Sequence, residues 1–161
     1  MAKNRFIITL DDKELTKQLE RAMQRAPNTT TKVVRGCLLD LAGRSAELAP
    51  IESGDLRNDC TAELNGVTVF EGQHATGIRS PSTLQAFGAV GYSLPYALRQ
   101  HEELDYRHDR TDGYVILSGP NAGRTVNMVA GGQAKFLEEP FNAQLPRYIA
   151  KLEKIPEEVI G

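Results

Sequence analysis

Alternation of apolar and polar residues predicts several short strands. Residues 5–10 (RFIITL) are β-branched and apolar and predict a strand near the start of the chain. Residues 60–72 alternate weakly around the dipeptide Asn65-Gly66, which is typical of a two-residue hairpin turn, so we expect two strands there. Residues 73–85 contain Gly, Ser and Pro and predict an exposed loop. A small-residue strand is then expected at 86–92, followed by a short helix.

A period of three to four residues predicts the helices. The first is expected at 11–26, where Pro27 should end it, and the second at about 30–48, with caps offered by residues 28–31. Residues 51–59 predict a turn and one or two helical turns, with Ser53 as the cap. A long C-terminal helix is expected from 134 to about 154, with a break or kink at its prolines. Its apolar stripe consists of Phe136, Leu137, Phe141, Leu145, Ile149 and Leu152.

A second hairpin is expected at 114–130, with its turn at 119–123. Because strands come as neighbouring hairpins instead of alternating with helices, the pattern predicts an α+β fold. We expect a small antiparallel or mixed sheet, with two N-terminal helices and the long C-terminal helix packed on it, and the second hairpin protruding. The 161 residues fit a single domain, 1–161.

Composition narrows the functional classes. The net charge is −2 and the pI is near 5.9, whereas a protein that mainly neutralises phosphates usually carries a basic surplus. A nucleic-acid-binding module using Lys32, Arg35 and Arg44 therefore ranks lowest. No apolar run has the length of a signal peptide or a membrane span, so we expect a soluble intracellular product. Cys37 is expected to be a buried thiol, and a bridge to Cys60 is not favoured.

Candidate catalytic residues are few. His101, Glu102, Asp105 and His108 could form a metal site, but their spacing is not H-E-x-x-H. No serine lies in G-x-S-x-G, and the glycines at 119–123 lack the G-K-[ST] of a phosphate-binding loop. We expect no catalytic residue, no metal and no cofactor. A metal-dependent enzyme using the His101, Glu102 and His108 cluster stays as the alternative.

Four segments in order resemble a family of tailed-bacteriophage minor capsid or tail-component proteins, which act in tail completion and head–tail joining. They are APIESGDLRND at 49–59, VGYSLPYALRQHEE at 90–103, DYRH at 105–108 and GGQAKFLEEPF at 131–141. Each motif alone is modestly specific, and together they span most of the chain. Family members often have a shorter connection where this chain has the hairpin 114–130.

The resemblance implies a virion structural protein and not an enzyme. Such a protein would form a closed ring, with a hexamer expected, at the head–tail junction (neck) of a long-tailed phage, completing the tail and joining it to the head. The implied partners are other copies of itself, a head-side connector or stopper protein, and a tail terminator or tail tube protein. DNA would pass through the lumen without tight binding, and no membrane is involved. The implied location is the virion neck, and the host cytoplasm during assembly.

Two groups of residues are candidates for subunit contacts. The first is polar, and these side chains are expected to make interface or loop-fixing contacts: Arg57, His101, Glu102 and Lys135. The second would form one apolar face of the second hairpin: Val115, Leu117, Val126 and Met128. The apolar and aromatic motif residues are instead expected to pack inside the fold: Leu56, Tyr92, Tyr96, Phe136 and Leu137.

Overall fold

A computed structural model describes residues 13–51, 54–102, 104, 114–115, 125–126 and 132–160. The predicted strand at 5–10 lies outside these residues. The elements, in chain order, are α1 Lys13–Leu48, α2 Asp55–Asn58, β1 Thr61–Leu64, β2 Val67–Glu71, β3 His74–Ala75, β4 Gly88–Gly91, α3 Ala97–Glu102, β5 Tyr114–Val115, β6 Thr125–Val126, α4 Glu138–Glu153 and α5 Ile155–Ile160. Helices and a small antiparallel sheet together confirm the predicted α+β class.

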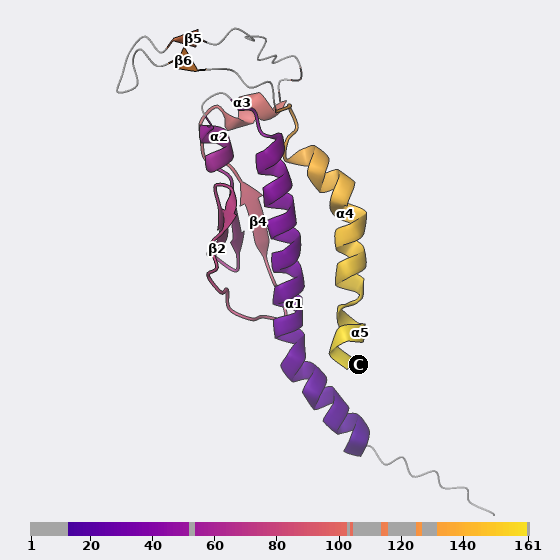
Figure 1. The fold of residues 1–161 in the computed structure, drawn as a ribbon. Coiled ribbons are helices and arrows are strands. Elements are labelled where there is room, and N and C mark those ends of the chain that lie inside the picture. The colour runs from indigo at the N-terminus through magenta and orange to yellow at the C-terminus, as the bar shows by residue number, and fades with distance from the viewer. Residues whose placement is uncertain are drawn as a thin grey trace, which may run out of the picture.

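One helix replaces the two that were predicted at the N-terminus. Pro27 lies inside α1, so the prediction that it ends a helix was wrong. Proline removes one helical hydrogen bond and crowds the preceding turn, and α1 bends in its N-terminal third (Figure 1). The expected caps bind another segment: the Asn28 side chain accepts a hydrogen bond from Ser82, and Thr31 Oγ1 accepts one from the backbone N–H of Thr83 at 3.1 Å. These tertiary contacts hold the turn that follows the proline in place.

The sheet has four strands in the order β3-β2-β1-β4, all antiparallel. Asn65 and Gly66 join β1 to β2 with φ angles of 53° and 76°, which confirms the predicted hairpin turn. The expected loop at 73–85 contains the two-residue strand β3 at its start. Ser53 lies outside the described residues, and Gly54 occupies the N-cap position of α2. Strands β5 and β6 pair with each other in a separate two-stranded sheet, beyond α3 in Figure 1.

The molecule has three layers, with α1 in the middle. The sheet packs on one side of α1, and α4 and α5 pack on the other (Figure 1). The C-terminal helices therefore pack mainly on α1. The prediction that the long C-terminal helix packs on the sheet was wrong. The main core lies between α1 and the sheet: Ala42, Ala46, Cys60, Ala62, Leu64, Val69 and Phe70. Both cysteines are free, as expected, and Cys60 is fully buried.

The C-terminal helix turns a different face to the core than predicted. It begins at Glu138 instead of 134 and continues through Pro146 without a break. Its buried residues are Pro140 and Tyr148, and the Tyr148 hydroxyl donates to Asp40 Oδ2 at 2.8 Å. The predicted stripe is partly exposed: Phe141 by 41%, Ile149 by 45% and Leu152 by 41%. The prediction failed because the aromatic ring and hydroxyl of Tyr148 take the position against α1.

Candidate functional site

Three of the four segments that carry the family resemblance meet at one end of the molecule, where α1 and α3 end; the fourth, 105–108, lies outside the described residues. Gln133 donates its backbone N–H to the Leu48 carbonyl at 2.9 Å, and Lys135 donates to the His101 carbonyl at 2.8 Å. The segment 132–138 therefore ties the end of α1 to the end of α3. We call the cluster formed by Tyr92, His101, Glu102, Lys135, Phe136 and Glu138 the junction.

Gly132 allows this segment to lie against the end of α1. Its φ is 106°, a conformation that residues with a Cβ rarely adopt. A Cβ at this position would lie 2.3 Å from Pro50 Cα and 2.6 Å from Pro50 N. Because these are backbone atoms, a larger residue would have to displace the chain. The glycine is thus required by the close approach of two motif segments.

Arg57, a predicted interface residue, binds the end of α1 inside its own chain. Its Nε donates to the Ala49 carbonyl at 3.0 Å and its Nη2 to the Glu47 carbonyl at 2.5 Å. The last carbonyls of a helix have no helical partner and carry partial negative charge, so a guanidinium satisfies both needs. The structure thus gives Arg57 the loop-fixing role that was one of its two predicted roles.

Phe136 is the centre of the junction and is 1% exposed. The rings of Tyr92 and His101 each meet it edge to face, with centroids 5.0 Å away. The Tyr92 hydroxyl pairs with Ser45 Oγ at 2.8 Å, which connects the junction to α1. Burial raises the pKa of Tyr92, so its hydroxyl stays protonated. These contacts confirm that Tyr92 and Phe136 pack inside the fold; Leu56 and Leu137 do so as well, whereas Tyr96 is exposed.

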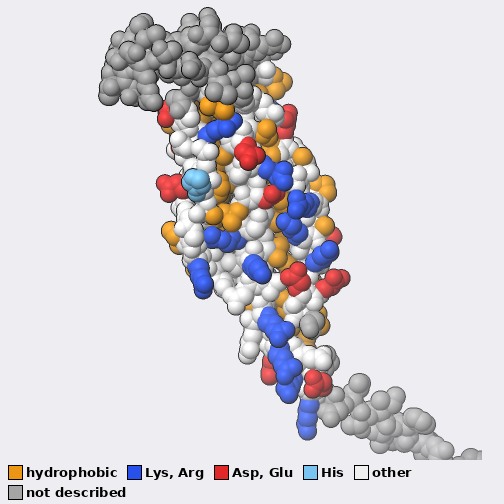
Figure 2. All heavy atoms as spheres, in the orientation of Figure 1, with side chains coloured by type: hydrophobic (Ala, Val, Ile, Leu, Met, Phe, Trp, Pro, Cys, Tyr) orange, Lys and Arg blue, Asp and Glu red, His pale blue; other side chains and the backbone are white. Residues whose placement is uncertain are grey.

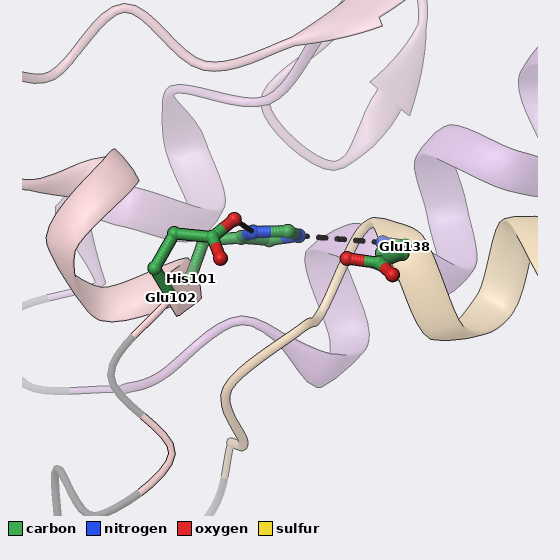
Figure 3. Close-up of side chains that lie close together, drawn as sticks. All are labelled: His101, Glu102 and Glu138. Atoms are coloured by element: carbon green, nitrogen blue, oxygen red, sulfur yellow. Dashed lines mark hydrogen bonds and ion pairs between the residues drawn. The ribbon is translucent and has the colours of Figure 1, made fainter.

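Charged side chains surround the exposed rim of the junction. His101 Nε2 accepts the backbone N–H of Glu138 at 3.3 Å, so Nδ1 is the donor to Glu102 Oε1 at 2.9 Å (Figure 3). Lys135 Nζ lies 2.5 Å from Glu102 Oε2 and 2.9 Å from Glu138 Oε2. Hydrogen bonds from Lys135 and then His101 lower the pKa of Glu102, and the Glu102 and Glu138 carboxylates raise the pKa of Lys135. The Glu102 carboxylate and the Lys135 ammonium are therefore both charged at neutral pH.

The same cluster bears on the metal alternative. One ligand atom from each of His101, Glu102 and Glu138 can be chosen so that all three lie within 4.8 Å of one another. However, the ammonium of Lys135 already contacts both carboxylates. Two predicted members, Asp105 and His108, lie outside the described residues. Glu138 was not predicted, because only tertiary packing brings it to His101.

Two shallow clefts meet beside the junction, and both include His101 and Leu137 in their walls. The first, of about 300 Å³, lies between α3 and the aromatic cluster and has Leu98 at its rim. The second, of about 400 Å³, lies between α1, β4 and the start of α4, and its walls are mostly apolar. Figure 2 shows apolar side chains at the surface between Lys and Arg side chains. Such walls suit the packing of another chain better than chemistry on a small polar substrate.

The four apolar interface candidates belong to the second hairpin, of which the structure describes residues 114–115 and 125–126. The register of the second hairpin pairs Val115 with Thr125 and Tyr114 with Val126, so the two valines do not lie opposite one another. Leu117 and Met128 lie outside the described residues. For the other two candidates the predicted single apolar face was wrong, because this register puts Val115 and Val126 on opposite faces of the two-stranded sheet.

The three basic residues of the nucleic-acid alternative do not form a free basic patch. Arg35 donates to the Ile78 carbonyl at 2.7 Å, and Arg44 pairs with Asp40 at 3.0 Å. Lys32 is exposed. Because Arg35 and Arg44 already make contacts within the chain, the structure does not support a phosphate-binding surface on α1.

Comparison with protein-family models, with curated proteins and with solved structures found no match to this chain. Among the helices that the structure describes, none combines the length and apolar character needed to cross a bilayer.

Proposed function

We propose that this chain is a structural subunit that closes into a ring at the neck of a long-tailed phage, completing the tail and joining it to the head. The family resemblance suggests this role, and one observation carries it further: large apolar side chains are exposed on two separate parts of the surface. On the projecting part of α1, Leu19 is 54% and Met23 73% exposed. At the other end, Tyr96, Leu98 and Leu104 are exposed around α3.

Two distinct surfaces are what a ring requires. In a ring of identical subunits, each copy contacts the next head to tail, so the two contact surfaces differ. The N-terminal third of α1 extends past the sheet and the C-terminal helices (Figure 1). A helix with apolar residues exposed in this way gains stability by packing on another chain. The partners proposed beyond the ring are a head-side connector or stopper and a tail terminator or tube protein, with DNA passing through the lumen.

The junction supports a role in assembly. Three of the four polar interface candidates contact one another here, and Lys135 and Glu102 join two segments that lie 33 residues apart. His101 uses both ring nitrogens within this network. These contacts hold loops in position for contact with a partner. Because His101, Glu102 and Glu138 already make these contacts, none of the described junction residues stands out as a general acid or base.

Light scattering of the purified full-length chain tests the proposal. A hexamer would have a mass of about 106 kDa, six times the 17.7 kDa of the chain. Met23→Glu should weaken the assembly by tenfold or more, since a charge would enter an apolar contact. Gln24→Glu adds the same charge at an exposed polar position on the same helical turn and should leave assembly unchanged. A chain that stays monomeric and does not bind purified connector or tail-tube proteins would refute the proposal.

A metal-dependent enzyme remains the second candidate, because His101, Glu102 and Glu138 lie within ligand distance of one another. Titration with zinc and with manganese separates the two functions. A metal enzyme should bind one ion per chain, and Lys135→Met should then tighten binding by removing the competing ammonium. For the structural protein we expect weak binding in the wild type, with no catalytic turnover gained in the variant.

A further inference from the structure

The sheet has an open edge next to an apolar groove. β4 is the last strand of the order β3-β2-β1-β4, and among the described residues β1 is its one neighbouring strand. The other edge of β4 thus offers backbone N–H and C=O groups that another strand could use. Gly88 and Val90 of this strand form part of the wall of the 400 Å³ groove. An added strand would pair with β4 and place side chains in the groove at the same time.

The walls of the groove are apolar. Leu38 and Leu41 of α1 form one side, and Leu137 and Phe141 the other. Leu38 packs so closely on Gly88 that a Cβ there would lie 2.4 Å from Leu38 Cδ1. Glycine at position 88 therefore lets the side chain of Leu38 lie against β4, and this contact forms one boundary of the groove. The partly exposed stripe of α4 described above continues from Phe141 at helical spacing, through Leu145, Ile149 and Leu152.

The chain itself contains a segment that fits such an edge. Residues 5–10, RFIITL, have the β-branched and apolar character of a strand, and they precede α1 by only two residues. Arg5, the far end of the segment, is eight residues from Lys13, so it lies at most about 29 Å from the start of α1. Leu38, which marks the level of β4, is 25 residues along the helix, or about 38 Å away. The segment 5–10 therefore cannot reach β4 of its own chain.

We infer that residues 5–10 of one copy add to the edge of β4 in a neighbouring copy, so that each subunit donates a strand to the next. This inference specifies a contact within the proposed ring and rests on the self-association proposed above. The donor segment precedes the projecting end of α1 by two residues in the sequence, and the acceptor edge belongs to the four-stranded sheet. The two surfaces are different, as a head-to-tail ring requires. Strand addition of this kind gains affinity from backbone hydrogen bonds and specificity from alternate side chains.

Charge favours an antiparallel direction for the added strand. The end of β4 at Gly91 leads to the junction, where Glu138 forms part of the groove wall. In an antiparallel arrangement, Arg5 of the donor would lie toward this end. Asp11 and Asp12, which follow the segment, would lie away from Glu138. The opposite direction would bring like charges together.

Disulfide trapping between two different variants tests the inference. Ala89→Cys on β4 is mixed with one of four donor variants, Phe6→Cys, Ile7→Cys, Ile8→Cys or Thr9→Cys, all in full-length chains with Cys37→Ala. Any covalent dimer between the two variants must then join two copies. Because side chains alternate across a strand, the yield should peak at one donor position and at a position two residues away. Ala75→Cys on β3, at the opposite edge of the sheet, is the matched control and should give little product.

A pair of proline variants gives an independent reading. Ile7→Pro and Ile8→Pro remove backbone N–H groups that point in opposite directions, so only one of them faces β4. We expect one of the two to weaken self-association by about tenfold or more, and the other to weaken it much less. Both substitutions lie outside the described residues, and circular dichroism should show unchanged melting.

The outcomes separate this inference from the proposed function. An oligomer without periodic trapping at Ala89, and insensitive to both prolines, would overturn strand donation and leave the ring intact. A chain that is monomeric and forms no covalent dimer would overturn both. Periodic trapping in a chain that binds no connector or tail protein would support strand donation and refute the neck function.

Discussion

Gly132→Ala should destabilise the protein strongly. At a φ of 106°, an alanine is strained by about 1–3 kcal/mol. Its Cβ would also lie 2.3 Å from Pro50 Cα, far inside the 3.5–4.0 Å of an ordinary carbon contact. Relieving such an overlap by moving backbone costs about 1–3 kcal/mol more. We therefore expect a loss of about 3 kcal/mol or more in the free energy of unfolding, a large part of the 5–15 kcal/mol typical of a domain.

Thermal and urea unfolding, followed by circular dichroism, measure this loss. For a chain of this length, 3 kcal/mol corresponds to a fall in Tm of about 6–12 °C. Gly36→Ala is the matched control, because Gly36 lies on the exposed face of α1 and a Cβ there meets no atom within 4 Å. That change should raise stability by about 0.5–1 kcal/mol, since alanine is the better helix former. If Gly132→Ala melts within 2 °C of the wild type, the close approach of the motif segments is refuted.

Three further predictions concern the same end of the molecule. Arg57→Ala should lower the free energy of unfolding by about 1.5–3 kcal/mol, because two carbonyls at the end of α1 lose a charged donor. Urea unfolding measures this loss, and a value below about 0.5 kcal/mol would contradict the capping role of Arg57. Tyr92→Phe should cost about 1–3 kcal/mol by leaving the Ser45 hydroxyl unpaired, and adding Ser45→Ala should recover part of that loss in a double-mutant cycle. Desolvation acts to raise the pKa of Asp59, but hydrogen bonds from Ser93 and Leu94 outweigh it and lower that pKa below 3.8. The stabilisation by Asp59 is therefore present above pH 3.8 and lost as the pH falls through the lowered value, so Asp59→Asn should flatten the acid limb of the curve of Tm against pH.

Local signals in the sequence were sufficient for the hairpin of β1 and β2 and for strand β4. The Asn65-Gly66 turn needs only two residues that adopt positive φ, and both do so here. Pro27 shows where local reasoning fails. Its cost to the helix is a few kcal/mol, and contacts from Asn28 and Thr31 to a loop more than 50 residues away bear on the outcome. No window around the proline contains those partners.

The site could be predicted in part. His101, Glu102 and Lys135 were chosen from motifs, and the structure brings them together. Glu138 was missed, and so was the way Lys135 bridges the two carboxylates. Segments separated by more than 30 residues meet here through tertiary contacts, the packing of Phe136 and the backbone hydrogen bond from Lys135 to His101 among them. The exposed stripe of α4 was predicted as apolar but assigned to the core. Sequence periodicity identifies an apolar face without saying which chain covers it.

The continuity of α1 has a consequence for the dimensions of any assembly. This one rod of 36 residues, about 54 Å long if straight, separates the end that would reach a neighbour from the end that packs against the sheet and α4. Every residue added to it would advance the reaching end by about 1.5 Å and turn it by about 100°. If the proposed ring closes in this way, its diameter would be adjustable only in steps of whole helical turns, and the length of α1 would set the width of its central opening.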